Sequence, residues 1–174
     1  GGKGCHYYIE NTPYLLDTTA EFYYDNPNKR LFLRLDQDKD PNTAVIEIAT
    51  AGKLLLIDAK HDIVISGLQF GFITSDVVRY NLIDFVPAIQ ISGSCYNIEI
   101  SHNKFTYVNG AIGAKNTNSP SRKAHDVEVS DNDLQVIDDM GIAFIYNGNV
   151  FFDKVRILRN RIYNNGARHL GASY

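Results

Sequence analysis

The stretch that decides the fold is Asn97-Ile-Glu-Ile-Ser-His-Asn-Lys-Phe105. The same pattern returns position for position as Asp126-Val-Glu-Val-Ser-Asp-Asn-Asp-Leu134 and as Lys154-Val-Arg-Ile-Leu-Arg-Asn-Arg-Ile162. A weaker copy, His61–Phe70, keeps the apolar positions but has Leu68 in place of the asparagine. Successive copies are separated by 35, 29 and 28 residues. A recurrence of this length indicates a protein built from stacked structural repeats.

Each copy has two apolar residues two positions apart, then a turn, then a third apolar residue. Most of these apolar positions hold β-branched side chains, which favour strands, and no segment has the 3.6-residue period of a helix. Parallel stacking about 4.8 Å apart would place equivalent side chains above one another. We therefore expect an all-β fold, a right-handed parallel β-helix. Its buried columns would be Ile98, Val127 and Val155; Ile100, Val129 and Ile157; and Phe105, Leu134 and Ile162.

An asparagine column lies on the turn of the repeat, at Asn103, Asn132 and Asn160. An amide there tolerates left-handed backbone geometry and can hydrogen-bond to the backbone and to the amide of the next coil. We interpret this column as structural. A second strand follows each turn, at Ala88–Ser92, Ala111–Lys115, Gly141–Ile145 and, incompletely, His169–Tyr174. The broken last strand predicts further coils after Tyr174, from the same protein or from another chain.

Residues 1–58 have the pattern of a separate β-rich layer. Apolar and polar residues alternate there in short runs: His6–Glu10, Glu21–Tyr24, Arg30–Leu35, Ala44–Ile48 and Lys53–Asp58. Asp25-Asn-Pro-Asn-Lys29 joins two of these runs with turn-forming residues, which predicts a hairpin over Glu21–Leu35. We expect this hairpin layer to precede the parallel coils of residues 59–174.

Composition and charge limit the classes of partner that we expect. Of the 174 residues, 44% are hydrophobic and 21% are charged, as in an ordinary globular protein. The net charge of −3 and the scattered basic residues argue against nucleic acid. Every apolar run is far shorter than the roughly 20 residues that cross a bilayer, so we expect no membrane span. Cys5 and Cys95 could form one disulfide, but their spacing does not indicate one. No nucleotide-binding motif is present, and no cofactor is expected.

The hairpin and the first coil carry a family resemblance. Ala20-Glu-Phe-Tyr-Tyr-Asp25 followed by Arg30-Leu-Phe-Leu-Arg34 resembles the hairpin "Gly-Glu-Trp-Tyr-Tyr-Asp … Gly-Thr-Leu-Tyr-Tyr" of the pectin lyase-like superfamily. His61–Phe70 is similar to the first full coil of that family. The likeness is to large bacterial β-helix glycoside hydrolases with a β-rich insertion ahead of the coils. Ala20 and Phe22 depart from it, since Gly and Trp are usual there.

This resemblance implies a secreted, periplasmic or cell-surface protein that acts on a polysaccharide or oligosaccharide, and a groove along the second strand and the turn before it. Because side chains alternate along a strand, Gln90 and Lys115 would face outward. Arg168 would supply a cation for a uronate, and His169 a general acid or base. The expected substrate-binding residues are Gln90, Asn109, Lys115, Arg168 and His169.

The candidate catalytic residues are Asp138, Asp139 and Asp84, because glycoside hydrolysis commonly uses two carboxylates. Adjacent residues in an extended segment face opposite ways, so a partner for Asp138 or Asp139 should come from another coil. Asp84 lies about two coils away, which is roughly 10 Å and closer to an inverting than to a retaining pair. The competing interpretation is a turn in which the two aspartates cap backbone amides.

Three functional hypotheses remain open. The leading one is glycoside hydrolysis. The first alternative is a polysaccharide lyase, in which Lys115 or Arg168 neutralises a uronate carboxylate. The second is a non-catalytic β-helix that binds glycan or supports assembly at a surface. No metal is expected, since Asp36–Asp40 opens like a calcium loop but has Pro41 where glycine is required.

Overall fold

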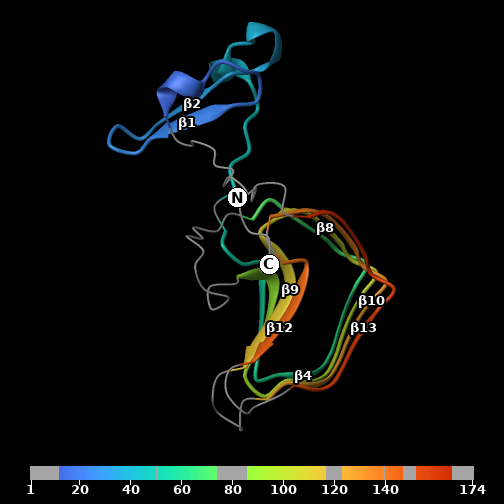
Figure 1. Ribbon diagram of the computed structural model, residues 1–174. Coiled ribbons are helices and arrows are strands. Elements are labelled where there is room, and N and C mark those ends of the chain that lie inside the picture. Colours follow the sequence, from blue (N-terminus) through green and yellow to red (C-terminus); the bar gives the residue numbers. More distant parts are fainter. Residues whose placement is uncertain are drawn as a thin grey trace, which may run out of the picture. The chain divides into compact units, whose positions relative to one another are not determined.

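A computed structural model describes residues 12–49, 51–73, 86–116, 123–138, 140–146 and 152–165. These residues belong to two compact units, one up to Ile48 and one from Ala49 onward. Apart from three short 3₁₀ turns, the regular structure in the described residues is β-strand (Figure 1). The all-β class is therefore confirmed.

The N-terminal unit contains the predicted hairpin, formed by β1 (Phe22–Asp25) and β2 (Arg30–Leu33) in antiparallel register (Figure 1). The turn between them closes as its residue types predict. The Asp25 carboxylate accepts hydrogen bonds from the backbone N–H of Asn28 at 3.3 Å and from its side chain at 2.7 Å. Local turn chemistry thus specifies this element.

The predicted strand over Ala44–Ile48 is wrong. The structure has a 3₁₀ turn at Pro41–Thr43 and irregular chain after it, and Val45 is 96% exposed. An alternating pattern forms a strand only where another strand can pair with it, and the described chain provides no such partner. The run His6–Glu10 lies outside the described residues.

The C-terminal unit consists of three four-stranded sheets in which neighbouring strands are parallel. The chain adds one strand to each sheet in turn and then returns to the first (Figure 1). Sheet I contains β3 (Leu55–Asp58), β6 (Pro87–Ser92), β9 (Gly110–Asn116) and β12 (Ile142–Tyr146). Sheet II contains β4 (His61–Ser66), β7 (Tyr96–Ser101), β10 (His125–Ser130) and β13 (Asp153–Leu158). Sheet III contains β5 (Gln69–Gly71), β8 (Lys104–Val108), β11 (Asp133–Ile137) and β14 (Arg161–Asn165).

Strand register agrees with the repeat. Val127 is the Cα partner of Ile98 and of Val155 in sheet II, and Leu134 is the partner of Phe105 and of Ile162 in sheet III. Two details differ from the sequence prediction. Each repeat has three strands rather than two, because the residues after the asparagine form a short strand of their own. The run ending at Asp58, expected in the hairpin layer, forms β3 and pairs with β6.

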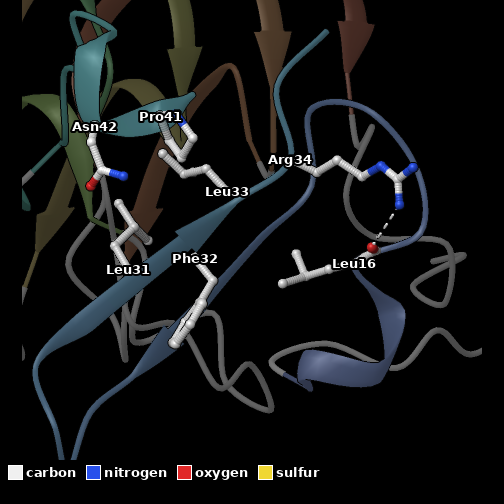
Figure 2. A pocket seen from close by; sticks show the side chains of 7 residues that line it. All are labelled: Leu16, Leu31, Phe32, Leu33, Arg34, Pro41 and Asn42. Carbon is white, nitrogen blue, oxygen red and sulfur yellow. Dashed lines mark hydrogen bonds between the residues drawn. The ribbon is translucent and has the colours of Figure 1, made fainter. Parts of the chain in front are cut away.

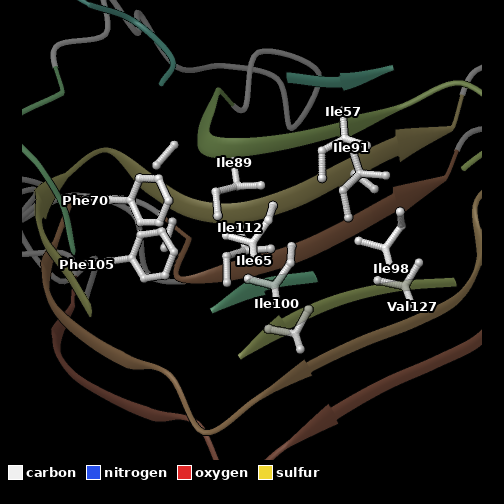
Figure 3. Close-up of a cluster of buried hydrophobic side chains, with 14 of the residues drawn as sticks. Ile57, Ile65, Phe70, Ile89, Ile91, Ile98, Ile100, Phe105, Ile112 and Val127 are labelled. Carbon is white, nitrogen blue, oxygen red and sulfur yellow. The ribbon is translucent and has the colours of Figure 1, made fainter. Parts of the chain in front are cut away.

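The three sheets share one core. Ile89 and Ile112 of sheet I, Ile100 of sheet II and Phe105 of sheet III are all 0% exposed (Figure 3). The ring of Phe105 stacks on that of Phe70 in the preceding repeat, with centroids 4.9 Å apart. Full burial of such a side chain contributes about 1.5–3 kcal/mol to the free energy of folding. The repeat therefore folds by placing apolar side chains from each strand in a common interior.

Cys95 lies in this core with a free thiol. Its Sγ donates to the Ser92 carbonyl oxygen at 3.0 Å. Cys5 lies outside the described residues. Cys95 therefore acts as a small core residue that also closes the turn between β6 and β7.

The corner between sheets II and III is held by the asparagine column. Asn132 Nδ2 donates to the Ile100 carbonyl oxygen at 2.8 Å and to Asn160 Oδ1 at 2.9 Å. Asn132 Oδ1 in turn accepts from the Asn103 backbone N–H at 2.9 Å. The predicted hydrogen bonds to the backbone and to the next amide are therefore present. Because Asn132 is only 1% exposed, these bonds satisfy groups that water cannot reach.

Left-handed geometry falls one residue before the asparagine, so that part of the prediction is wrong. His102, Asp131 and Arg159 have φ of 58°, 56° and 52°, and Gly67 has 72° at the same position of the first copy. The asparagine keeps ordinary backbone geometry, and its side chain closes the turn that the preceding residue makes. Each such non-glycine residue carries backbone strain, which the paired neighbours above and below hold in place.

Candidate functional site

The long connections of the C-terminal unit all begin or end at sheet I. Sheets II and III are joined only by residues 67–68, 102–103, 131–132 and 159–160. By contrast, residues 72–86 lead into β6, residues 117–124 follow β9, and residues 147–152 follow β12. Binding and catalytic residues concentrate on connections that a rigid scaffold positions. Sheet I is therefore the candidate site, and it is made of the strands that the sequence singled out.

Side chains alternate as predicted on β6 of sheet I, whereas residues 110–114 of β9 are all buried. Ile89 and Ile91 are 0% exposed, while Gln90 between them is partly exposed. Gln90 shares an outward column with Leu56, Gly113 and Ala143. Ala143 in this column is only 9% exposed. The outward column therefore combines an exposed leucine and one polar side chain with two small residues, Gly113 and Ala143, that are buried.

Asn109 and Asp138 occupy equivalent turns of successive repeats, before β9 and β12. The Asp138 backbone N–H donates to the Val108 carbonyl oxygen at 3.0 Å, which fixes the two turns against each other. Asn109 is 3% exposed and Asp138 is 5% exposed, and both take part in further interactions. The structure thus brings together one predicted catalytic and one predicted binding residue, at the edge of sheet I where each chain segment enters it.

The remaining predicted site residues are not placed. Asp84, Asp139, Arg168 and His169 lie outside the described residues, and so does the side chain of Lys115 on β9. The pairing of Asp138 with Asp84 therefore stays a prediction.

Within the described strands of sheet I the one carboxylate is Asp58, at the exposed end of β3, whereas Asp138 is buried in the turn before β12. β3 and β12 are three strand spacings apart, roughly 14 Å across the sheet. The two aspartates also lie at opposite ends of their strands, which increases their separation. Two carboxylates that act on one glycosidic bond lie within about 10 Å. Asp58 is therefore not the catalytic partner of Asp138.

Sheet II carries a polar face that the sequence reasoning missed. Glu99 and Glu128 are Cα partners on β7 and β10. Each accepts a hydrogen bond from the serine two residues later, Ser101 at 2.8 Å and Ser130 at 3.0 Å, and Arg156 donates to Glu128 at 2.6 Å. The signal was the Glu-x-Ser segment common to two copies of the repeat. Because these carboxylates are held by neighbours on the same sheet, the arrangement is typical of a scaffold.

A column of rings runs beside them. His61, Tyr96 and His125 are stacked with centroids 4.5 Å and 5.3 Å apart. The Nδ1 atoms of the two histidines lie 2.7 Å from Asp62 Oδ2 and 2.6 Å from Asp126 Oδ2. Sugars bind aromatic side chains through the ring faces. Since the ring faces within this column cover one another, the column favours a structural role over sugar binding.

Hydrogen bonds from neighbouring side chains lower the pKa of Asp126 and Asp131 on this surface. The hydrogen bond with His125, with a smaller contribution from Lys154, holds the pKa of Asp126 below its usual value. The hydrogen bond from Arg159 does the same for Asp131, and raises the pKa of Arg159 in return. Both guanidinium contacts of Arg159 are short, at 2.8 Å and 2.6 Å. Opposite charges on β10, β13 and the turns that follow them are therefore paired across the strands.

The N-terminal unit contains a shallow pocket of about 560 Å³ (Figure 2). Its lining consists of Leu16, Leu31, Phe32, Leu33, Arg34, Pro41 and Asn42. The one hydrogen bond drawn there runs from Arg34 Nη1 to the Leu16 carbonyl oxygen at 3.2 Å. No carboxylate, histidine or thiol lines the pocket, so it lacks an acid, a base and a nucleophile.

Residues 36–38 form a 3₁₀ turn, and the Asp40 carboxylate accepts from the Asn42 backbone N–H at 2.9 Å. Within the described ranges, no three His, Cys, Asp or Glu side chains converge as metal ligands. The same ranges contain no helix long and apolar enough to span a membrane.

Comparisons with protein-family models, curated proteins and solved structures gave no match.

Proposed function

We propose that the C-terminal unit is a right-handed parallel β-helix that cleaves a polysaccharide by glycoside hydrolysis on sheet I. Three parallel sheets that each gain one strand per repeat support the β-helix. Parallel crossovers are right-handed in about 98% of cases, which supports the handedness. The pectin lyase-like relationship and a location outside the cytoplasm belong to the same proposal, and they rest on the hairpin and first-coil motifs.

The observation that carries the proposal is the placement of the long connections. Each of them precedes or follows a strand of sheet I in the chain, whereas the corner between sheets II and III has two-residue turns throughout. A sheet whose strands carry the long connections can form the floor of a groove. Successive strands would offer equivalent positions at about 4.8 Å intervals, which suits a linear polymer of repeating sugar units.

Asp138 is the proposed acid or base, because it is a carboxylate at the edge of this sheet, in a turn whose backbone is hydrogen-bonded to the preceding repeat. Asp139 is the alternative at the same turn, and the partner of either would be Asp84 from another repeat. Gln90 and Asn109 would bind sugar hydroxyls, together with Lys115, Arg168 and His169. The two carboxylates would divide the work of protonating the leaving oxygen and activating water.

The test is an activity screen on neutral and uronate polysaccharides, with new reducing ends as the signal for hydrolysis. Asp138→Asn should lower activity by a factor of about 100 or more, as expected for loss of a general acid or base. Asp153→Asn is the matched control, because Asp153 is an exposed carboxylate on sheet II. Unfolding temperatures of both variants would separate lost chemistry from lost fold. An unsaturated, ultraviolet-absorbing product would instead assign the lyase reaction, and equal activity of both variants would remove Asp138 from the mechanism.

The second candidate is a non-catalytic β-helix that binds glycan. Burial of Asp138 to 5% exposure beside Asn109, which is 3% exposed, favours it, because a buried carboxylate is less accessible to substrate. Glycan binding without any cleavage, unchanged in Asp138→Asn, would establish this alternative.

A further inference from the structure

Two apolar columns, that of Ile100 and Val129 in sheet II and that of Phe105 and Leu134 in sheet III, end in exposed residues at one end of the stack only. Ile157 and Ile162 in the last described repeat are 50% and 44% exposed, although Val129 and Leu134, their partners one repeat earlier, are 0% exposed. At the opposite end, Ile65 of β4 is 6% exposed and is already covered. The two ends of the stack are therefore not equivalent.

The asparagine column also has a direction. The backbone N–H of Leu68, of Asn103 and of Asn132 each donates to the side-chain Oδ1 of the asparagine in the following repeat, at 3.0, 2.9 and 3.0 Å. Asn160 is the next donor in this series, and no asparagine in the described ranges accepts from its backbone N–H. The end at β13 and β14 therefore lacks an amide oxygen at one defined position.

Charge changes sign between the last two described repeats. The outward positions of β10 and its turn are acidic, and those of the last repeat are basic. The pairs join Asp126 to Lys154 at 3.4 Å, Glu128 to Arg156 at 2.6 Å and Asp131 to Arg159 at 2.6 Å. In sheet III, the basic Arg161 of the last repeat is likewise the Cα partner of the acidic Asp133 one repeat earlier. A strand placed beyond β13 would face basic side chains, and opposite charges across a strand pair are stabilising.

We propose that the outer edge of β13 and β14 is a docking surface for one further parallel coil of polypeptide. The coil would have the chemistry of Asp126–Leu134: apolar residues over the columns of Val155, Ile157 and Ile162, an asparagine over Asn160, and carboxylates at the outward positions. Strand addition of this kind combines backbone hydrogen bonds with side-chain specificity. A second copy of this chain is a poorer occupant, since its covered β4 end offers no apolar columns to match. The proposal does not depend on glycan cleavage.

The probe is a labelled synthetic peptide that copies residues 125–138, added to the 174-residue chain and followed by fluorescence anisotropy. We expect saturable binding that weakens as salt rises, because exposed charge pairs are screened. A peptide with the Asn132 position changed to alanine should bind roughly tenfold more weakly, which corresponds to about 1.4 kcal/mol. A basic peptide that copies residues 153–165 should not bind.

Charge reversal in the protein completes the test. The double variant Arg156→Glu with Arg161→Glu should bind the acidic peptide more weakly and should bind the basic peptide. Lys29→Glu in the hairpin should leave the binding of both peptides unchanged. Arg161→Glu alone keeps the test informative if the double variant unfolds, because Arg161 lies over the Tyr163 ring and forms no ion pair with a described residue. Equal binding of both peptides, or no peptide binding together with self-association of the chain, would overturn the proposal.

Discussion

At the scale of single residues, the asparagine column contributes most per side chain. Asn132 links three repeats, because it bonds to Ile100 and Asn103 on one side and to Asn160 on the other. No apolar residue of the same size could satisfy these buried backbone groups. The column therefore fixes the height of each turn relative to the next as well as closing it.

Asn132→Ala should lower the free energy of unfolding by about 3 kcal/mol, since it leaves several buried groups without partners. Chemical denaturation is the measurement. Gln135→Ala, on the neighbouring strand and partly exposed, is the control and should cost less than about 1 kcal/mol. Similar losses for the two variants would contradict the role assigned to the column.

The charged pairs predict how stability responds to acid. Asp126 and Asp131 have pKa values held below the usual value by His125 and Arg159 respectively. A carboxyl group with a lowered folded pKa contributes stability above its unfolded pKa of about 4, and this contribution is lost as pH falls through the folded value. The double variant Asp126→Asn with Asp131→Asn should therefore lose less stability between pH 5 and about pH 2 than the parent chain. An identical acid response measured by thermal unfolding would show that these pairs contribute nothing.

At the scale of strands, burial depends on position within the stack more than on residue type. Ile100 and Ile157 are the same residue in one column, but the first is 0% exposed and the second is 50% exposed. Ile100→Ala should lower the free energy of unfolding by about 2–5 kcal/mol, because it leaves a cavity between paired strands. Ile157→Ala should cost less than about 1 kcal/mol in the same denaturation experiment. Equal costs would mean that the last strand is covered as fully as the inner ones.

The sequence predicted sheet II and its columns because a repeat with β-branched residues at fixed spacing has one natural register. The sequence did not predict the strands of sheet III as separate elements, because three to five residues after a turn are too few to show an alternation of apolar and polar positions. It also placed a strand at Ala44–Ile48, where the pattern is present but a pairing partner in the described chain is not. Local pattern specifies how a strand would face, and tertiary contacts decide whether it forms.

At the scale of the whole molecule, the sequence identified the sheet of the candidate site but not its chemistry. Alternation was enough to place Gln90 outward and Ile89 inward. The burial of Asp138 and Asn109 depends on how successive turns pack, which no spacing reveals. Charge matching between repeats was equally hidden, because it becomes visible only when Asp131 and Arg159 are known to be neighbours.

The central claim is that successive repeats stack in parallel with the observed register, and disulfide trapping tests it most directly. In a background without Cys5 and Cys95, Glu99→Cys with Glu128→Cys places two thiols on paired positions of β7 and β10. Their Cα separation of about 4.8 Å lies within the range for a disulfide, whereas Glu99→Cys with Arg156→Cys spans two strands, roughly 10 Å. Mass spectrometry after mild oxidation should show complete bridging of the first pair and none of the second. Bridging of the second pair, or failure of the first in a folded chain, would contradict the stack.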